Sequence, residues 1–147
     1  MLNLSLTQKA YLAGFLDGDG SIYVRLKPNP TYRYGFQIAP YIVLFQSRKG
    51  KVNFEKLCSL IGLGYLRDRK DGVLEYIINR KENLRLFLDA IEPYAVLKKK
   101  QVVLMKKILD AKEKIKNKAD FEKLAKLIDS FRELNYSKKR KKRTLTP

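Results

Sequence analysis

The residues with the clearest chemical potential are Asp17-Gly18-Asp19-Gly20, which follow an apolar stretch of helical spacing. At the C-terminal end of a helix, carboxylates and main-chain carbonyls gather where the helix dipole is negative. Hard divalent cations prefer such oxygen ligands, so the pattern favours Mg2+ binding. Taken alone, the four residues are equally well described, and more commonly found, as an Asp-Gly turn between a helix and a strand.

Composition excludes several other kinds of site. The chain has no His, no Trp and a single Cys, Cys58. Ser-His-Asp and Cys-His triads, histidine-dependent metal nucleases and a zinc site built by one chain are therefore excluded. Cys58 lies in an apolar stretch, where we expect it to be a small buried hydrophobe without a disulfide partner.

Charge indicates the class of partner. In 147 residues, 32 Lys and Arg face 15 Asp and Glu, which gives a formal charge of +17 and a pI near 10.0. An apolar fraction of 45% with nine Tyr and seven Phe favours a folded nucleic-acid binder over a disordered basic protein. A membrane surface is the weaker alternative. Because no apolar run is long enough to span a bilayer and the start does not resemble a secretory signal, we expect an intracellular protein with no membrane partner.

The first elements position the Asp-Gly cluster. Ser5 and Gln8 fit a capping box, which predicts a helix over about residues 6–16. Alternation of apolar and polar residues predicts strands over about residues 22–27 and 34–46. Pro40 interrupts the second strand and predicts a bulge or bend there.

The remaining chain continues the pattern. Helical spacing predicts a helix over residues 53–61, and an Asp-Gly turn joins short strands at 65–69 and 73–79. Further helices are expected at about residues 81–91, 98–116 and 120–134. The order α-β-β-α-β-β-α-α predicts an α+β fold with a curved antiparallel four-stranded sheet and helices on one face. We expect one domain over residues 1–136 and a basic tail over 137–147.

Small residues follow one side of the first helix. Ala10, Ala13, Gly14 and Gly18 are spaced so that another helix backbone can approach closely. This pattern predicts a tight helix partner.

The other face of the sheet is expected to be open. Between Gly20 and Phe54 there is no acidic residue but several basic ones, which predicts a polyanion-binding face; a merely solvated face is the alternative. Strand parity turns the following residues to that face: Tyr23, Arg25, Lys27, Gln37, Ala39, Tyr41, Val43, Arg67, Arg69, Glu75 and Ile77.

The string Leu12-Ala13-Gly14-Phe15-Leu16-Asp17-Gly18-Asp19-Gly20 resembles the signature of the LAGLIDADG homing endonucleases. Further strings are similar to the compact single-motif members: Ser21-Ile22, Lys27-Pro28-Asn29, Leu97-Lys98, Lys100-Gln101 and residues 61–69. The resemblance spans about residues 7–140. Because the motif occurs once, it implies a homodimer joined through Ala10, Ala13, Gly14 and Asp17, which reads a nearly palindromic DNA site.

The resemblance also implies catalytic roles. Asp19 matches the metal-binding carboxylate and the carbonyl of Gly18 a second ligand, whereas Asp17 matches an acid that caps and packs. Mg2+ is the expected cofactor, with Mn2+ able to substitute and Ca2+ supporting binding without cleavage. The absence of His agrees with activation of the attacking water by a metal ion.

Three further positions match catalytic roles. Gln46 resembles the polar residue that orders water near the nucleophile, and Lys98 the basic residue that stabilises the charge developing on the phosphate. One departure from the family is Gly50, which stands where close relatives have a second basic residue. Lys49 or Lys51 is expected to replace it.

The outward strand positions match the family's major-groove face. Arg25, Arg67 and Arg69 are the expected guanine contacts and Gln37 the adenine contact, whereas Ala39, Val43 and Ile77 offer apolar contact alone. Outer bases or backbone are assigned to Asn29, Thr31, Tyr32 and Arg33. Phosphates are assigned to Ser137, Lys138 and Lys141 in the tail.

These features together predict a metal-dependent endonuclease that makes a double-strand break with 3′ overhangs. The alternative is a protein of the same fold without cleavage, either an intron RNA maturase that binds its own intron RNA or a cleavage-deficient DNA-binding protein. A generic basic ribosomal or chromatin-like protein does not explain the nine-residue string.

Overall fold

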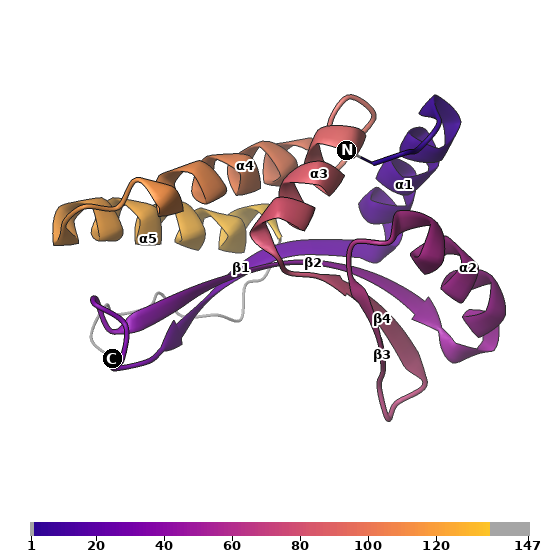
Figure 1. Ribbon diagram of the computed structural model, residues 1–147, viewed down its shortest axis with the longest axis horizontal. Coiled ribbons are helices and arrows are strands. Elements are labelled where there is room, and N and C mark those ends of the chain that lie inside the picture. The colour runs from indigo at the N-terminus through magenta and orange to yellow at the C-terminus, as the bar shows by residue number, and fades with distance from the viewer. Residues whose placement is uncertain (1, 136–147) are drawn as a thin grey trace.

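The computed structural model describes residues 2–135 as alternating helices and strands (Figure 1). The order of helices and strands confirms the predicted α+β fold. The elements are α1 (Leu6–Asp19), β1 (Gly20–Pro28), β2 (Phe36–Ser47), a short 3₁₀ helix η1 (Arg48–Gly50), α2 (Lys51–Ile61), β3 (Tyr65–Asp68), β4 (Val73–Ile78), α3 (Lys81–Ile91), α4 (Lys99–Glu113) and α5 (Lys118–Leu134).

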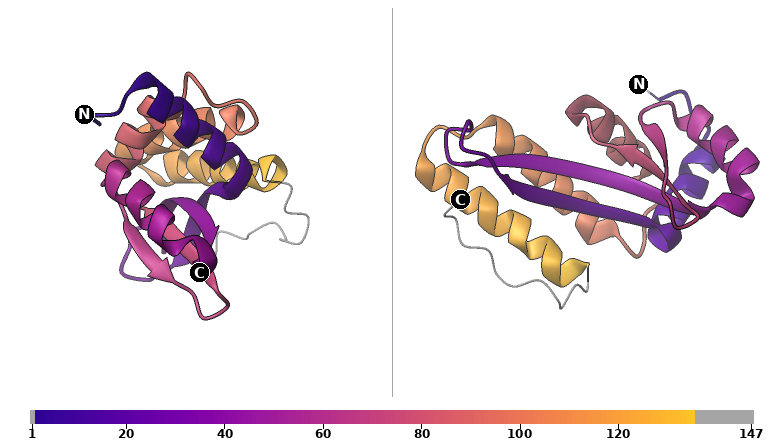
Figure 2. Two further views of the ribbon diagram at one scale, coloured as in Figure 1. Left: turned by 90° about the vertical axis from the view of Figure 1, so that its right-hand side faces the viewer. Right: turned by 90° about the horizontal axis from the view of Figure 1, so that it is seen from below.

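The four strands form one antiparallel sheet in the order β1-β2-β4-β3. The sheet is curved, with α1, α3, α4 and α5 on one face and the opposite face open (Figure 1). Seen from below, β1 and β2 present a face that carries no helix (Figure 2). The sheet therefore offers one long uncovered surface, as the strand pattern predicts.

The core lies between the sheet and its helices. Ile22, Val24 and Leu26 of β1 are buried, and α4 and α5 pack over this strand. At the other end, Phe15 of α1 stacks on Phe54 of α2 with ring centroids 6.0 Å apart. No helix within residues 2–135 is long and apolar enough to cross a membrane.

Helix α1 differs from its prediction at its C-terminal end. The capping box of Ser5 and Gln8 is present, but the helix continues through Asp19 instead of ending near Leu16. The Lys98 ammonium donates to the carbonyl of Asp17, which stabilises the last turn. The backbone of Gly20 packs tightly against the last turn of α1, because a Cβ on Gly20 would lie 2.8 Å from the carbonyl oxygen of Leu16. The alternative of a simple Asp-Gly turn is therefore wrong, because these residues form the last helical turn and its exit.

Pro40 does not produce the predicted bulge. Pairing of β1 with β2 runs one residue for one residue, with Pro40 opposite Val24. On its other side, β2 first pairs with β4 where Ile42 faces Ile78. β4 ends before it reaches Pro40, so the missing N–H of Pro40 costs no hydrogen bond to β4. Strand β2 therefore continues without interruption.

Candidate functional site

The C-terminal end of α1 carries an exposed carboxylate. Asp19 and Gly18 are both exposed, and no hydrogen bond or ion pair reaches the Asp19 side chain from elsewhere in residues 2–135. The same described residues contain no group of three metal-binding side chains. One chain therefore supplies one carboxylate and nearby carbonyls, which suit a divalent cation only if a second carboxylate comes from outside the chain.

Asp17 binds the segment that precedes α4. Its carboxylate accepts hydrogen bonds from the backbone N–H groups of Val96, Leu97 and Lys98 at 2.9, 3.0 and 3.0 Å. Partial burial is the largest single influence and raises the pKa of Asp17, but these three hydrogen bonds and the charge of Lys98 together lower it. The acid caps a neighbouring helix end within its own chain, so its side chain is not free to bind a metal.

Lys98 and Gln46 approach the same end of α1 from two other segments. The Lys98 ammonium lies 2.7 Å from the carbonyl oxygen of Asp17. Gln46 lies two residues after Leu44, which pairs with Gly20 directly after the helix. The Gln46 side-chain oxygen accepts a hydrogen bond from the N–H of Ser47 at 2.8 Å, which fixes its direction. The structure thus places Lys98 and Gln46, two residues from distant parts of the sequence, around the helix terminus that bears Asp19.

The segment around Gly50 is basic and exposed. A Cβ at Gly50 would lie 3.4 Å from Cγ of Gln46, so the missing side chain leaves Gln46 uncovered on this side. Lys51 lies 3.8 Å from Glu55 one helical turn later. Lys49 is exposed, and its ammonium has no carboxylate within ion-pair distance among residues 2–135. Of the two lysines beside Gly50, Lys51 therefore has a carboxylate partner, whereas Lys49 has none among residues 2–135.

The outer side of α1 is bare. Ala10 and Gly14 are exposed, and apart from the adjacent residues and backbone of α1 itself, a Cβ at Gly14 or Gly18 would meet no atom of residues 2–135 within 4 Å. Ala13 is an exception to the predicted interface, because helix phase turns it inward with Leu12 and Leu16 and it is fully buried in its own core.

Two exposed apolar residues near α1 were not predicted from the sequence. Val96 and Leu97 are each 76% exposed and lie in the segment that Asp17 holds. Their exposure could have been predicted from the sequence, because both apolar residues fall outside a helical period and directly precede a run of lysines. They enlarge the apolar surface beside the bare side of α1.

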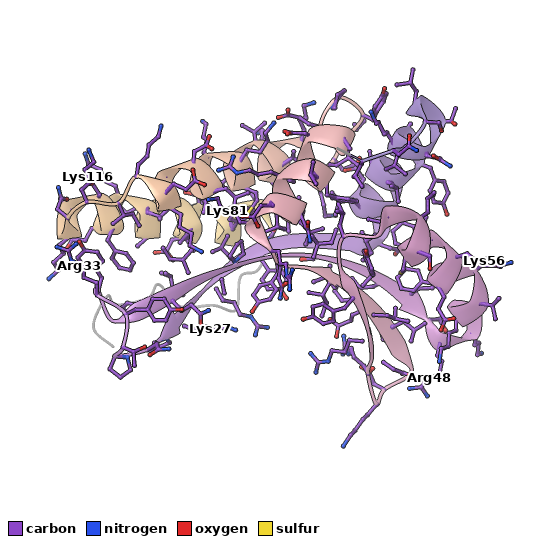
Figure 3. The ribbon with its side chains drawn as sticks, viewed as in Figure 1. Lys27, Arg33, Arg48, Lys56, Lys81 and Lys116 are labelled. Atoms are coloured by element: carbon purple, nitrogen blue, oxygen red, sulfur yellow. The ribbon has the colours of Figure 1, made fainter. Side chains whose placement is uncertain are left out.

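Four residues form a compact group on the open face of β1 and β2, which we call the tyrosine cluster: Tyr23, Arg25, Lys27 and Tyr41. The two tyrosine rings stack with centroids 5.1 Å apart. The Arg25 guanidinium lies 5.5 Å from the ring centroid of Tyr23 and 5.8 Å from that of Tyr41. Lys27 donates to the Tyr41 hydroxyl at 2.8 Å and extends from the underside of the sheet (Figure 3). These predicted base-reading side chains are therefore ordered by one another.

A second charged group lies on β3 and β4. Glu75 has 13% of its side chain exposed and lies 3.9 Å from Arg67 and 4.0 Å from Arg69. Arg48, which was not among the predicted site residues, donates to Asp68 and to the carbonyl of Arg69. This arginine links the tip of the β3–β4 hairpin to the end of β2. Its place in the basic run after Gln46 was the sequence feature that could have predicted a role for it.

Three apolar positions predicted to contact bases are covered. Ala39, Val43 and Ile77 are 8%, 0% and 6% exposed. Parity turns them to the open face, but Val43 lies between Ser21 and Ile77, and Ala39 lies opposite the long side chain of Arg25. These three side chains therefore expose little surface for the predicted apolar contact, and Val43 exposes none in this chain.

The hairpin loop between β1 and β2 lies at the end of the molecule farthest from α1 (Figure 1). Asn29 accepts hydrogen bonds from the backbone and hydroxyl of Thr31, which shapes the loop. Tyr32 and Arg33 are exposed, and Arg33 lines a pocket together with Lys112 and Ile115 from the end of α4 and the connection that follows it. Gln37 is half-buried at the start of β2. The predicted contacts Ser137, Lys138 and Lys141 lie outside the described residues.

Comparison with known proteins places this geometry in a family. The family of LAGLIDADG endonucleases matches residues 12–109. The chain is 38% identical over 132 residues to the DNA endonuclease I-CreI of Chlamydomonas reinhardtii, covering 89% of this chain and 80% of that one. It is 29% identical to the DNA endonuclease I-CvuI of Chlorella vulgaris, covering 89% of this chain and 81% of that one.

A solved structure extends the likeness to the fold. I-CvuI, crystallised with the I-CreI target in 2 mM Mg and with its DNA not cleaved, superposes with a TM-score of 0.81 at 28% identity. The superposition covers 94% of this chain and 86% of that one. From its motif, its fold and these relatives, the chain belongs to the LAGLIDADG endonuclease family.

Proposed function

We propose that the protein is a site-specific homing endonuclease that binds double-stranded DNA as a homodimer and breaks both strands, leaving 3′ overhangs. One observation carries the proposal: an exposed Asp19 carboxylate, which has no hydrogen-bond or ion-pair partner within residues 2–135, ends a helix whose outer side is bare at Gly14 and Gly18. Two copies joined through this side bring two Asp19 carboxylates together. A basic open sheet face lies beneath each copy.

A divalent cation fits this arrangement only between two copies. The Asp19 carboxylate and the Gly18 carbonyl of each chain are the ligands, and Mg2+ is the natural cofactor for such oxygen donors. When bound, the cation neutralises charge on the scissile phosphate and lowers the pKa of water. Two equivalent copies suit a nearly palindromic site, because each reads one half.

The chain's own residues complete the chemistry. Lys98, held at the end of α1, stabilises the negative charge that develops on the phosphate. Gln46 orders water through its side-chain amide. We assign the second basic role to Lys49, since Lys51 has an acidic neighbour and Lys49 has none within residues 2–135.

Side chains on the open sheet face recognise the DNA sequence. Arg25, Arg67 and Arg69 have the two-pronged donor geometry that matches guanine in the major groove. The hairpin loop contacts the outer bases or backbone, and the tail after Asn135 contacts phosphates. Removal of residues 138–147 then lowers affinity for all sequences alike, which a binding comparison on specific and unrelated DNA would detect.

The test begins with selection of a target. A randomised double-stranded DNA library is bound to wild-type protein in Ca2+, and the selected DNA is then incubated in Mg2+ and in Mn2+. We expect no cutting in Ca2+ and cutting of both strands in Mg2+. The variant Asp19→Asn keeps the shape of the side chain but removes its charge, so cleavage falls by orders of magnitude while selection of the same DNA persists.

Two results would contradict the proposal. Equal cleavage rates for Asp19→Asn and wild type would show that Asp19 is not a ligand of the metal. If the wild type never cuts its best-bound DNA in either metal but promotes splicing of a bound intron RNA, the protein is a maturase of the same fold. If it only binds, it is a cleavage-deficient DNA-binding protein.

A further inference from the structure

Within the tyrosine cluster, Tyr41 contacts each of the other three side chains. Its ring stacks on Tyr23, which lies directly opposite in the strand pairing. The same ring lies 5.8 Å from the Arg25 guanidinium and 5.4 Å from the Lys27 ammonium. Its hydroxyl oxygen accepts the hydrogen bond from Lys27 at 2.8 Å.

Without these contacts, the two cations would be poorly ordered. Arg25 and Lys27 lie two residues apart on the same face of β1, so their like charges repel each other. The negative faces of the tyrosine rings attract both cations. The Tyr41 hydroxyl adds a charge-assisted hydrogen bond to Lys27 alone.

Such ordering has a consequence for DNA recognition. Arg and Lys side chains lose much rotamer freedom when they are fixed against a base. Fixing one such side chain at an interface weakens binding by about 2- to 12-fold, and a side chain that is already fixed avoids this loss. The residue that holds the readers in place therefore affects discrimination without touching a base.

We propose that Tyr41 is a positioning residue: it fixes Arg25 through its ring and Lys27 through its hydroxyl in the orientations that read the target. This inference rests on the proposed function, in which the open sheet face that carries Arg25 and Lys27 reads the DNA. It changes the role of Tyr41 itself from a DNA contact to a support for two neighbouring contacts. Tyr41 is half-buried and its hydroxyl is already bonded, which suits that role.

The ring and the hydroxyl can be tested separately. Tyr41→Phe removes the hydrogen bond to Lys27 and keeps the ring, whereas Tyr41→Leu removes both. Base preferences of each variant are measured by selection from a library in which every position of the wild-type target is varied singly, with Ca2+ present to prevent cutting. Tyr94→Phe, a tyrosine after α3 on the helical side, is the matched control for loss of a hydroxyl.

We expect Tyr41→Phe to reduce discrimination about 2- to 12-fold at the base pairs that change in Lys27→Ala, and to leave those of Arg25→Ala intact. Tyr41→Leu reduces discrimination at both sets. The melting temperature of each variant, compared with wild type, confirms that the fold persists. If Tyr41→Leu unfolds, Tyr41→Phe alone decides the hydroxyl role.

Double variants separate positioning from direct contact. In an Arg25→Ala background, Tyr41→Leu should have no further effect at the base pairs that Arg25 reads. A persistent effect there, or a new effect at a base pair that none of Arg25→Ala, Lys27→Ala and Tyr23→Ala alters, would mean that Tyr41 contacts DNA itself and would overturn the inference. Unchanged preferences in both Tyr41 variants would overturn it too. If the wild type selects no sequence at all, the proposed function fails first, and this inference fails with it.

Discussion

The end of α1 and the open face of the sheet differ in how far one chain completes them. At the helix end, Asp19 has no partner in residues 2–135, and the side of the helix at Gly14 and Gly18 is bare. On the sheet face, Lys27 is bonded to Tyr41, and Glu75 lies between Arg67 and Arg69. One region is left open, whereas the other is ordered within the chain.

This difference indicates where a second copy is needed. In the proposed function, a phosphate-cleaving centre at the end of α1 has half of its carboxylates until another chain supplies the rest. Base reading then needs no such help, because the sheet side chains assigned to one half of the site lie on one chain. The division predicts that substitutions near α1 alter cleavage or assembly and that substitutions on the sheet alter which DNA is bound.

Among substitutions that leave Asp19 and dimer assembly intact, Lys98→Ala should give the largest effect. Removing the ammonium withdraws a charge from the scissile phosphate, and loss of one such electrostatic donor costs about 10²- to 10³-fold in rate. DNA affinity should change little. Single-turnover cleavage and binding are measured side by side, with Lys100→Ala as control because that lysine lies on the exposed side of α4. An equal loss of rate in the control would show that general basicity, and not position, matters.

Asp17→Asn should lower the stability of the fold, whereas Asp19→Asn should slow cleavage, although the two residues are close neighbours. The carboxylate accepts three backbone hydrogen bonds, and hydrogen bonds to charged groups contribute about 1.5–3 kcal/mol. We expect the free energy of unfolding to fall by about that amount, as measured by urea denaturation. A stable but inactive Asp17→Asn protein would contradict the capping role.

The pKa of Asp17 gives this contribution a pH dependence. Because the pKa in the folded chain lies below its ordinary value of 3.8, the stabilisation is fully present above pH 3.8. It is lost as the pH falls below that value towards the folded pKa. Wild type should therefore lose stability on acidification more steeply than Asp17→Asn does, and parallel curves would contradict the assignment.

Glu75→Gln should give the smallest effect, confined to the sheet. Loss of this negative charge between two arginines should strengthen binding to all DNA about threefold, since the arginines are then freer to meet phosphates. Discrimination at the base pairs read by Arg67 and Arg69 should decrease. Fluorescence anisotropy on specific and unrelated DNA measures both quantities. Weaker binding to the specific site alone would mean that Glu75 contacts a base directly.

Much of the fold follows from local patterns. Ser5 and Gln8 specify the start of α1, and alternation along β1 specifies which side chains face the helices. The C-terminal end of α1 was missed because its stabilisation comes from Lys98, which lies 81 residues away from Asp17 in the sequence. A local pattern carries no information about such a contact.

The site shows the same limit. Parity places Val43 on the open face correctly, but whether it is accessible depends on Ser21 and Ile77 in the adjacent strands. The small-residue pattern includes Ala13, yet only the phase of the packed helix shows that Ala13 belongs to the core. Asp19 could be singled out from the motif, because its proposed role depends on residue type and helix position more than on packing, and it is exposed at the end of α1.

The variant Gly14→Leu tests most directly whether α1 joins two copies of the chain. A Cβ at this position meets no atom within 4 Å outside the neighbouring backbone of α1, so the fold should remain stable, whereas a second helix packed there would be forced away. Light scattering at micromolar concentration, with cleavage of the selected target measured on the same sample, decides the question. We predict a monomer of 17.2 kDa that does not cut, beside a wild-type dimer that does. A Gly14→Leu protein that remains dimeric and cleaves at the wild-type rate would contradict the claim that α1 joins two copies to complete the site.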